Sequence, residues 1–228
     1  MKGKLIVIEG GDGAGKATQL GLLKEYLVKK KLPFATLSFP QYKNTFFGKT
    51  IGKFLRGEIG ELKEMNPYLL SLVYAMDRAE ARDKMYKWLN SGKIVALDRY
   101  VSSNMAHQTG RLPQNKRAKF LRWIDELEYT VNNVPREDIV FYLYVPYKVS
   151  QKLMADQNRG KNPNLKERDI VEKDLEYLKN AEDVYMLLYK KFPHWEKINC
   201  VNEKGEMRTR EEIHNDIKKI LIEKNVLT

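Results

Sequence analysis

The chain has 228 residues, 43% of them hydrophobic, which is enough to bury the core of one large domain. Its single cysteine, Cys200, excludes an internal disulfide, no Cys/His cluster has metal-ligand spacing, and a reducing, cytoplasmic setting follows. The formal charge of +11 favours anionic partners, although the charges are spread along the chain as on an ordinary solvated surface. We expect a soluble protein without a membrane partner, because the start of the chain does not resemble a signal peptide and runs such as residues 139–145 are too short to cross a bilayer.

Apolar, β-branched runs bounded by turn residues predict five strands, and their continuous pattern indicates burial on both faces. These strands are expected at residues 4–10, 33–39, 93–99, 138–145 and 197–201. The intervals carry helical patterns, at residues 15–30, about 45–57, 67–91, about 115–132, 148–157, 169–191 and 209–224. Alternating strands and helices predict an α/β fold with a parallel five-stranded sheet flanked by helices. No linker or repeat divides the chain, so we expect a single domain over residues 1–228.

The first strand leads directly into GGDGAGKAT, residues 10–18, which also opens the first helix. This segment matches the phosphate-binding pattern G-x-x-x-x-G-K through Gly10, Gly15 and Lys16. In such a loop the backbone N–H groups, the helix N-terminus and the lysine all present positive charge to phosphate oxygens. A glycine turn without a ligand is the alternative, and the combined strand, spacing, lysine and helix argue against it. The expected ATP-binding residues of the loop are Gly10, Gly11, Asp12, Gly13, Ala14, Gly15, Lys16, Ala17 and Thr18.

The position after Lys16, usually Ser or Thr in this pattern, is Ala17, so the hydroxyl that often binds the magnesium of the nucleotide is absent. Thr18 is rotated by about 100° around the helix and cannot simply replace it. Mg²⁺ then has to rely on phosphate oxygens, water and carboxylates elsewhere. We expect the phosphate cradle to remain and one metal contact to be weaker.

The third strand ends in Asp98-Arg99-Tyr100, at the edge where open parallel sheets bind ligands. Asp98 is placed like the acidic residue that holds magnesium or its water, and Arg99 like a clamp for a second phosphate. A surface ion pair is the alternative for a bare tripeptide. The strand and the phosphate loop together favour the ligand site.

Five segments in this order resemble the thymidylate kinase family, whose members phosphorylate dTMP with ATP. They are EGGDGAGK (9–16), SFPQY (38–42), YAMDRAEAR (74–82), DRYVSSNMAHQTGR (98–111) and the basic stretch 158–168. The resemblance runs from the first strand to about residue 190 and implies a P-loop NTPase-type nucleoside monophosphate kinase that uses Mg²⁺. It also implies a homodimer, for which the apolar helix 66–76 is a candidate contact, and a mobile lid at about residues 157–169.

On the acceptor side, the resemblance implies that Asp12 faces the sugar and the acceptor phosphate. Phe39 and Pro40 would shape the pocket. Tyr74, in place of the usual Phe, would stack on thymine, and Arg78 would bond the base edge. Without the resemblance, an aromatic residue on an apolar helix face is more often part of the core.

The segment after Tyr100 resembles the turn that lines the base in this family. Ser103 and Gln108 belong to it, and Asn104 would meet the thymine edge with its paired donor and acceptor. His107 stands where an aromatic residue, often Tyr, is expected. We interpret it as a pocket wall rather than a catalytic base, because the chemistry needs no base of this kind.

In this family a basic residue from either the phosphate loop or the lid covers the moving phosphoryl group. The loop position is Gly13, so the lid has to supply that residue, and Arg159 is favoured over Lys161 and Arg168 as a catalytic and ATP-binding residue. A closing lid would also keep water out, whereas a solvated basic loop is the alternative. Glu172 is either near the magnesium or an exposed helix carboxylate. The expected metal ligands are Asp12, Asp98 and Glu172.

We therefore expect transfer of the γ-phosphoryl group of ATP to dTMP, giving dTDP and ADP in dTTP synthesis. One alternative is a kinase of another nucleoside monophosphate or a deoxynucleoside on the same fold, since Tyr74 and His107 depart from the usual pocket. Another is a basic P-loop module that binds nucleic acid with ATP as a switch. A base-sized pocket favours the kinase, so no nucleic-acid partner is expected. The expected catalytic residues are Lys16, Asp12, Arg99 and Arg159.

Overall fold

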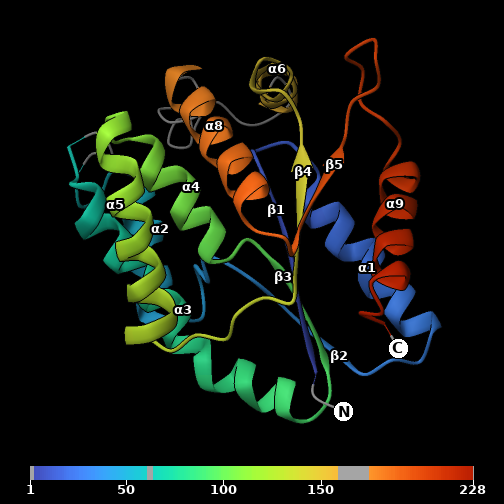
Figure 1. Ribbon diagram of the computed structural model, residues 1–228. Coiled ribbons are helices and arrows are strands. Elements are labelled where there is room, and N and C mark those ends of the chain that lie inside the picture. Colours follow the sequence, from blue (N-terminus) through green and yellow to red (C-terminus); the bar gives the residue numbers. More distant parts are fainter. Residues whose placement is uncertain (1–2, 61–63, 159–174, 228) are drawn as a thin grey trace.

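Parallel strands form one five-stranded sheet in the computed structural model, which describes residues 3–60, 64–158 and 175–227. The strands are β1 (Lys4–Gly10), β2 (Phe34–Ser38), β3 (Ile94–Asp98), β4 (Ile139–Tyr144) and β5 (Trp195–Asn199). Their spatial order is β2-β3-β1-β4-β5 (Figure 1). The predicted parallel sheet is confirmed, with each strand within a few residues of its expected place.

Helices cover both faces of the sheet (Figure 1). One face carries α1 (Lys16–Lys29) and α9 (Arg210–Glu223), and the other carries α3 (Pro67–Asn90), α4 (Val101–Gly110), α5 (Gln114–Asp125) and α8 (Leu175–Lys191). Further helices are α2 (Phe46–Leu55), which packs on α3, and α6 (Tyr147–Asn158), which packs on α8. None of the helices in the described ranges has the length and hydropathy that a bilayer crossing demands.

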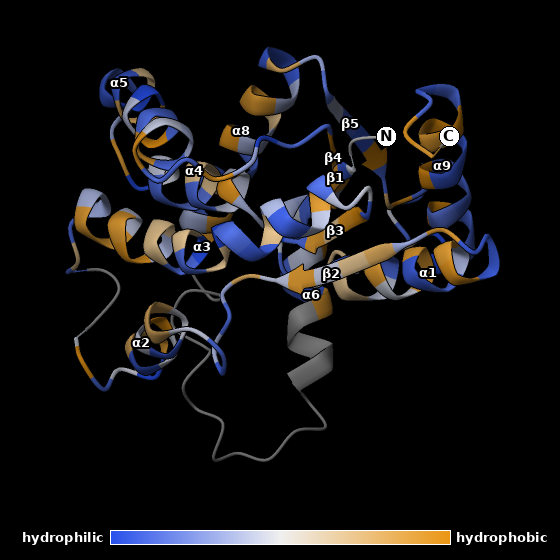
Figure 2. Cartoon of the chain, turned by 90° about the horizontal axis from the view of Figure 1, so that it is seen from below, coloured by the Kyte–Doolittle hydropathy of each residue, from blue (hydrophilic) through white to orange (hydrophobic). Residues whose placement is uncertain are grey.

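Alternate residues of β1 enter two separate cores. Leu5 and Val7 pack with residues of α3, α4, α5 and α8, whereas Ile6 and Ile8 pack with residues of α1 and α9. All four side chains are fully buried. In Figure 2 the helices show orange and blue on the same ribbon, as expected for amphipathic helices around a sheet. Burial on both faces explains the continuously apolar sequences of the inner strands β1, β3 and β4. The expected two-sided burial is wrong for β2 and β5, which lie at the edges of the sheet and are only partly buried.

The helix α4 occupies a segment that the sequence predicted to be a turn. Its sequence, VSSNMAHQTG, is rich in weak helix formers, and its first turn receives no cap from the side chain of Tyr100. The carboxylate of Glu9 on β1 accepts hydrogen bonds from the backbone N–H groups of Tyr100 (2.8 Å) and Ser103 (3.0 Å) instead. A cap that comes from another element is invisible to a local pattern, so the helix was missed.

The expected helix over residues 115–132 is present, but it changes its winding after α5. Residues Glu126–Val131 form the π-helix η1, and the N–H of Asn132 donates to the carbonyl of Leu127 at 2.9 Å, five residues back. Such short π segments often occur at functional sites. In η1 the side chain of Glu128 is fully buried, and its partners lie on α3 and α4.

Candidate active site

The phosphate loop joins the end of β1 to the start of α1. Gly10 has a φ of 150°, and a Cβ atom there would lie 2.7 Å from the carbonyl oxygen of Leu143 on β4, so only glycine fits. Gly15, the residue before α1, has a φ of 87° in the left-handed region. The loop is therefore a narrow turn that delivers the chain to the N-terminus of α1, as the motif predicts.

Lys16 reaches back across this loop. Its ammonium group donates to the carbonyl oxygens of Gly11 (2.7 Å) and Gly10 (3.1 Å) and lies 3.8 Å from the carboxylate of Asp12. Burial, and then the charge of Arg99, lowers the pKa of Lys16 to about 8. The loop thus contains a buried cation that is still mostly protonated at neutral pH.

Arg99 follows β3 directly, and β3 pairs with β1 in register Ile8 to Asp98. Arg99 has a φ of 65°, which is rare for a residue other than glycine. One end of its guanidinium forms an ion pair with Asp12, and its Nη1 donates to the Oγ of Ser103 at 3.3 Å. Burial acts to raise the pKa of Asp12, but the charges of Arg99 and Lys16 outweigh it and the net pKa lies below the usual range. The structure therefore brings three of the predicted catalytic residues together at the carboxyl ends of β1 and β3.

Glu9 is a central carboxylate of the site that the sequence interpretation missed. Besides capping α4, it accepts hydrogen bonds from the hydroxyl groups of Ser102 (2.8 Å), Ser103 (2.7 Å) and Tyr185 (2.9 Å), and it is fully buried. It ties β1, α4 and α8 together behind Arg99. An acidic residue within an otherwise apolar buried strand was the available signal, because a buried carboxylate requires donors around it.

On the base side, Arg78 of α3 and Asn104 of α4 both contact Glu128 of η1. The Arg78 Nε donates to Glu128 at 3.0 Å, its Nη2 forms a second, closer contact, and both side chains are almost completely buried. The Asn104 Nδ2 donates to Glu128 at 3.0 Å and to the carbonyl of Ser71 at 3.1 Å. Within the described part of the chain, the Asn104 Oδ1 and the Ser71 Oγ are buried without a hydrogen-bond partner. Sequence reasoning missed Glu128, which lies 50 positions after Arg78 and has no local signal.

Other predicted acceptor residues differ in how they are placed. Tyr74 is half-buried, and burial together with Tyr42 and Tyr177 raises its pKa, so its hydroxyl stays protonated. Phe39 is buried in the core against the ring of Tyr100, at 5.9 Å between ring centroids, and a cis peptide bond joins it to Pro40. Phe39 therefore lies in the core beside Tyr100.

The remaining predicted residues of this segment lie on α4. The Gln108 side chain is buried and accepts a hydrogen bond from Arg111 at 3.0 Å. His107 lies between Arg99 and Tyr177, and its ring nitrogens are 3.3 Å and 2.9 Å from polar atoms of these two residues. Both side chains thus brace other polar groups of the site.

Of the expected metal ligands, Asp12 lies 3.8 Å from the ammonium group of Lys16, and the charge of Asp98 acts on the same group. Burial raises the pKa of Asp98, although Lys16 and Arg99 act to lower it. Carboxylate oxygens suit Mg²⁺, but within the described ranges no group of three or more potential metal ligands occurs. The first two residues of the expected lid, 157 and 158, end α6, and the rest of it lies outside the described residues. The same holds for the predicted side chains in or after the lid, namely Arg159, Lys161, Arg168 and Glu172.

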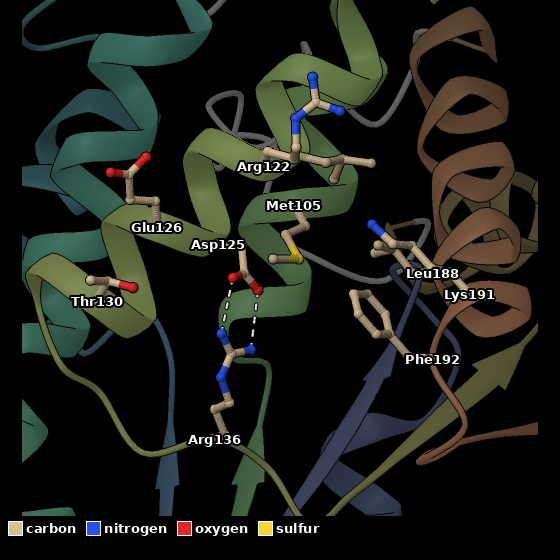
Figure 3. Close-up of a pocket in the computed structure, with 10 residues that line it drawn as sticks. Met105, Arg122, Asp125, Glu126, Thr130, Arg136, Leu188, Lys191 and Phe192 are labelled. Atoms are coloured by element: carbon tan, nitrogen blue, oxygen red, sulfur yellow. Dashed lines mark hydrogen bonds and ion pairs between the residues drawn. The ribbon is translucent and has the colours of Figure 1, made fainter.

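A hollow of about 460 Å³ lies away from the phosphate loop, between α4, the α5–η1 region and α8 (Figure 3). A bidentate ion pair between Arg136 and Asp125 lies on its wall, with contacts of 3.1 Å and 2.9 Å. Phe192, Leu188 and Met105 supply apolar surface there. None of its lining residues belongs to the predicted site.

Comparison with known proteins gives a consistent result. The sequence profile of the family described as Thymidylate kinase matches residues 8–217. The chain is 33% identical over 184 residues to a protein named thymidylate kinase from Mycobacterium tuberculosis (strain H37Rv), with 79% of this chain and 83% of that protein covered. It is 32% identical over 221 residues to the thymidylate kinase of Plasmodium falciparum (isolate 3D7), with 96% and 89% covered.

A solved structure of thymidylate kinase from Candida albicans superposes on this chain with a TM-score of 0.71 and covers 99% of this chain and 93% of its own. At 20% sequence identity this likeness concerns the fold. It agrees with the P-loop NTPase-type arrangement of the sheet and the phosphate loop. The profile match and the sequence relatives together establish that the chain belongs to the thymidylate kinase family.

Proposed function

We propose that the chain transfers the γ-phosphoryl group of ATP to dTMP and releases dTDP and ADP. The observation that carries the proposal is the meeting of Lys16, Asp12 and Arg99 at the carboxyl ends of β1 and β3, in a chain of this family. Phosphoryl transfer requires mainly positioning and neutralisation of charge, and it needs no covalent intermediate on the protein. Nothing in the comparisons favours a kinase of another substrate or a nucleic-acid-binding module.

The donor side is built from the phosphate loop. Its backbone N–H groups and the N-terminus of α1 face the phosphates of ATP, and the ammonium group of Lys16 exchanges its loop carbonyls for phosphate oxygens. Arg99, held by Asp12, lies between this loop and the acceptor and binds the phosphate of dTMP. Among the residues outside the described ranges, Arg159 is proposed to cover the transferred group from the lid.

The metal ion of the reaction is proposed to be Mg²⁺, which neutralises charge on the phosphate oxygens of ATP when bound. Asp98 and Asp12 are the described carboxylates beside Lys16 that would hold it or its water. Ala17 offers no hydroxyl, so these carboxylates and water replace that ligand.

The base of dTMP is proposed to lie between Tyr74 and the group of Arg78, Asn104 and Glu128. The buried Oδ1 of Asn104 has no hydrogen-bond partner among the described residues and suits the N3–H donor of thymine. Glu128 fixes the orientation of both neighbouring side chains. Stacking on Tyr74 would add about 1–3 kcal/mol.

A homodimer in the cytoplasm completes the proposal. The α2 and α3 surfaces expose apolar side chains, among them Phe46 (71% exposed) and Leu69 (57% exposed), beside the half-exposed Leu72 and Met76. This surface is the proposed contact between two copies, because apolar groups of this size are stabilised by burial. Light scattering should give twice the chain mass, and Leu69→Glu should give the single mass.

The proposed activity is tested by coupled measurement of ADP release with ATP, Mg²⁺ and one acceptor at a time. We expect turnover with dTMP and much slower turnover with dUMP, dGMP and thymidine. Phosphorylation of a different acceptor at the highest rate would replace dTMP as the substrate. ATP binding without phosphorylation of any monophosphate would refute the kinase proposal.

A further inference from the structure

His107 has polar neighbours on both sides of its ring. The Nε2 atom lies 3.3 Å from Nη1 of Arg99, and the Nδ1 atom lies 2.9 Å from the hydroxyl oxygen of Tyr177 on α8. The His107 ring also stacks on Tyr177, with centroids 5.7 Å apart and planes at 20°, and meets Tyr185 edge to face at 5.8 Å. Two hydrogen bonds and two ring contacts therefore fix the orientation of the imidazole.

The chemistry of the partners determines which nitrogen carries the proton. A guanidinium group has only donors, so Nε2 of His107 must accept the hydrogen bond from Arg99. A neutral imidazole then carries its hydrogen on Nδ1, which donates to the oxygen of Tyr177. A doubly protonated ring would direct an N–H group against the N–H group of Arg99.

The surrounding charges favour the same neutral form. Among the described residues, the charges of Arg99 and Lys16 oppose a positive ring and that of Asp12 favours it. The α8 side chains that face the ring, Tyr177 and Tyr185, are uncharged phenols. Burial first, and then the charge of Arg99, lowers the pKa of His107 to about 3. The ring is therefore an uncharged acceptor across the pH range in which kinases are assayed.

The backbone conformation and the contacts of Arg99 show why it needs such an acceptor. Its backbone is in the left-handed region, and Asp12 binds it through Nη2 alone. Its Nη1 has two neighbours, Ser103 and His107. With Nη2 and Nη1 both held, the plane of the guanidinium is fixed while the rest of its donors remain available to phosphate.

We propose that His107 is a positioning residue for phosphoryl transfer, whose uncharged ring holds Nη1 of Arg99 and links it to α8 through Tyr177. This inference rests on the proposed kinase function and adds to it. It also explains why a histidine can stand here in place of the usual aromatic residue, because its ring nitrogen offers Arg99 an acceptor.

Kinetics of two substitutions test the role of the acceptor. His107→Phe keeps a ring against Tyr177 but offers Arg99 no acceptor, and we expect kcat to fall at least tenfold while KM for ATP changes by less than twofold. His107→Gln places an amide oxygen near the former Nε2, and we expect kcat within about threefold of the wild type. His194→Gln, remote from the site, is the matched control and should leave kcat unchanged. Equal loss of kcat in the Phe and Gln variants, or full kcat in the Phe variant, would overturn the proposal.

Nitrogen-15 NMR of labelled histidine gives a second readout that does not depend on turnover. The His107 signals, assigned by their disappearance in His107→Gln, should show the Nδ1–H tautomer without titration from pH 5.5 to 8. An Nε2–H tautomer, or titration near the ordinary histidine value, would refute the geometry. If the wild-type chain fails to phosphorylate dTMP, the proposed function fails, whereas an active wild type with a titrating His107 defeats only this inference.

Discussion

Glu128→Gln is the substitution whose cost follows most directly from the structure. Glu128 is fully buried, Arg78 is 2% exposed, and the Glu128 carboxylate forms an ion pair with that guanidinium. Removing the negative charge leaves a buried cation without compensation, which typically costs about 3–5 kcal/mol. The amide keeps one oxygen acceptor, but its NH2 group replaces the second oxygen, which accepts from the Nε of Arg78. For a chain of this size each kcal/mol corresponds to a shift of about 2–4 °C, so we expect the melting temperature to fall by about 6–20 °C.

A double substitution separates the buried charge from the volume of the side chains. In Arg78→Met with Glu128→Leu both charges disappear together, and such replacements of a buried ion pair are often neutral for stability. We expect this variant to regain at least half of the lost stability in urea unfolding. Its KM for dTMP should be at least tenfold above the wild-type value, because the polar contacts to the base are gone. A Glu128→Gln protein that unfolds at the wild-type urea concentration would show that Arg78 is already solvated, and the reasoning would be wrong.

Three further predictions concern the phosphate loop and its support. Because the pKa of Lys16 is lowered to about 8, its ammonium group loses its proton as the pH rises through that value. We therefore expect kcat/KM for ATP to decline above about pH 8. The decline should vanish in Lys16→Arg, whose side chain stays charged. Ala17→Ser should leave kcat within an order of magnitude, as measured by ADP release, and a large rescue from near-inactivity would instead show that the metal shell of the wild type is defective. Glu9→Gln should weaken the cap of α4, lower the melting temperature and reduce kcat through Arg99, and full kcat at an unchanged melting temperature would contradict this.

The sequence was most informative where burial imposes a pattern. The strands were predictable because residues such as Leu5 and Ile6 face different cores, which makes the whole strand apolar. The phosphate loop was predictable because its glycines and Lys16 are fixed by local backbone geometry and by the helix that follows. These features are set within about ten residues of chain, and a local pattern therefore contains them.

The polar contacts between distant elements were not predictable in the same way. Glu9 and Tyr185 are 176 positions apart, and Arg78 and Glu128 are 50 apart, so their pairing follows only from the packed fold. The helix α4 was missed for the same reason, since its cap comes from β1. The single-domain organisation, the lid and the roles assigned to individual site residues stay predictions.

The two arginines of the site differ in how tightly their carboxylates hold them, and this difference separates their roles. Asp12 is 43% exposed and Arg99 is 18% exposed, so water reaches one side of this pair and weakens it relative to a fully buried one. Arg99 can therefore exchange the contact of its Nη2 with Asp12 for one with an incoming phosphate, while Ser103 and His107 still hold its Nη1. The pair of Arg78 with Glu128 is buried, and breaking it would leave an uncompensated charge. Arg78 consequently keeps its partner throughout a catalytic cycle and suits the base, which does not change, whereas Arg99 suits the phosphate, whose charge does.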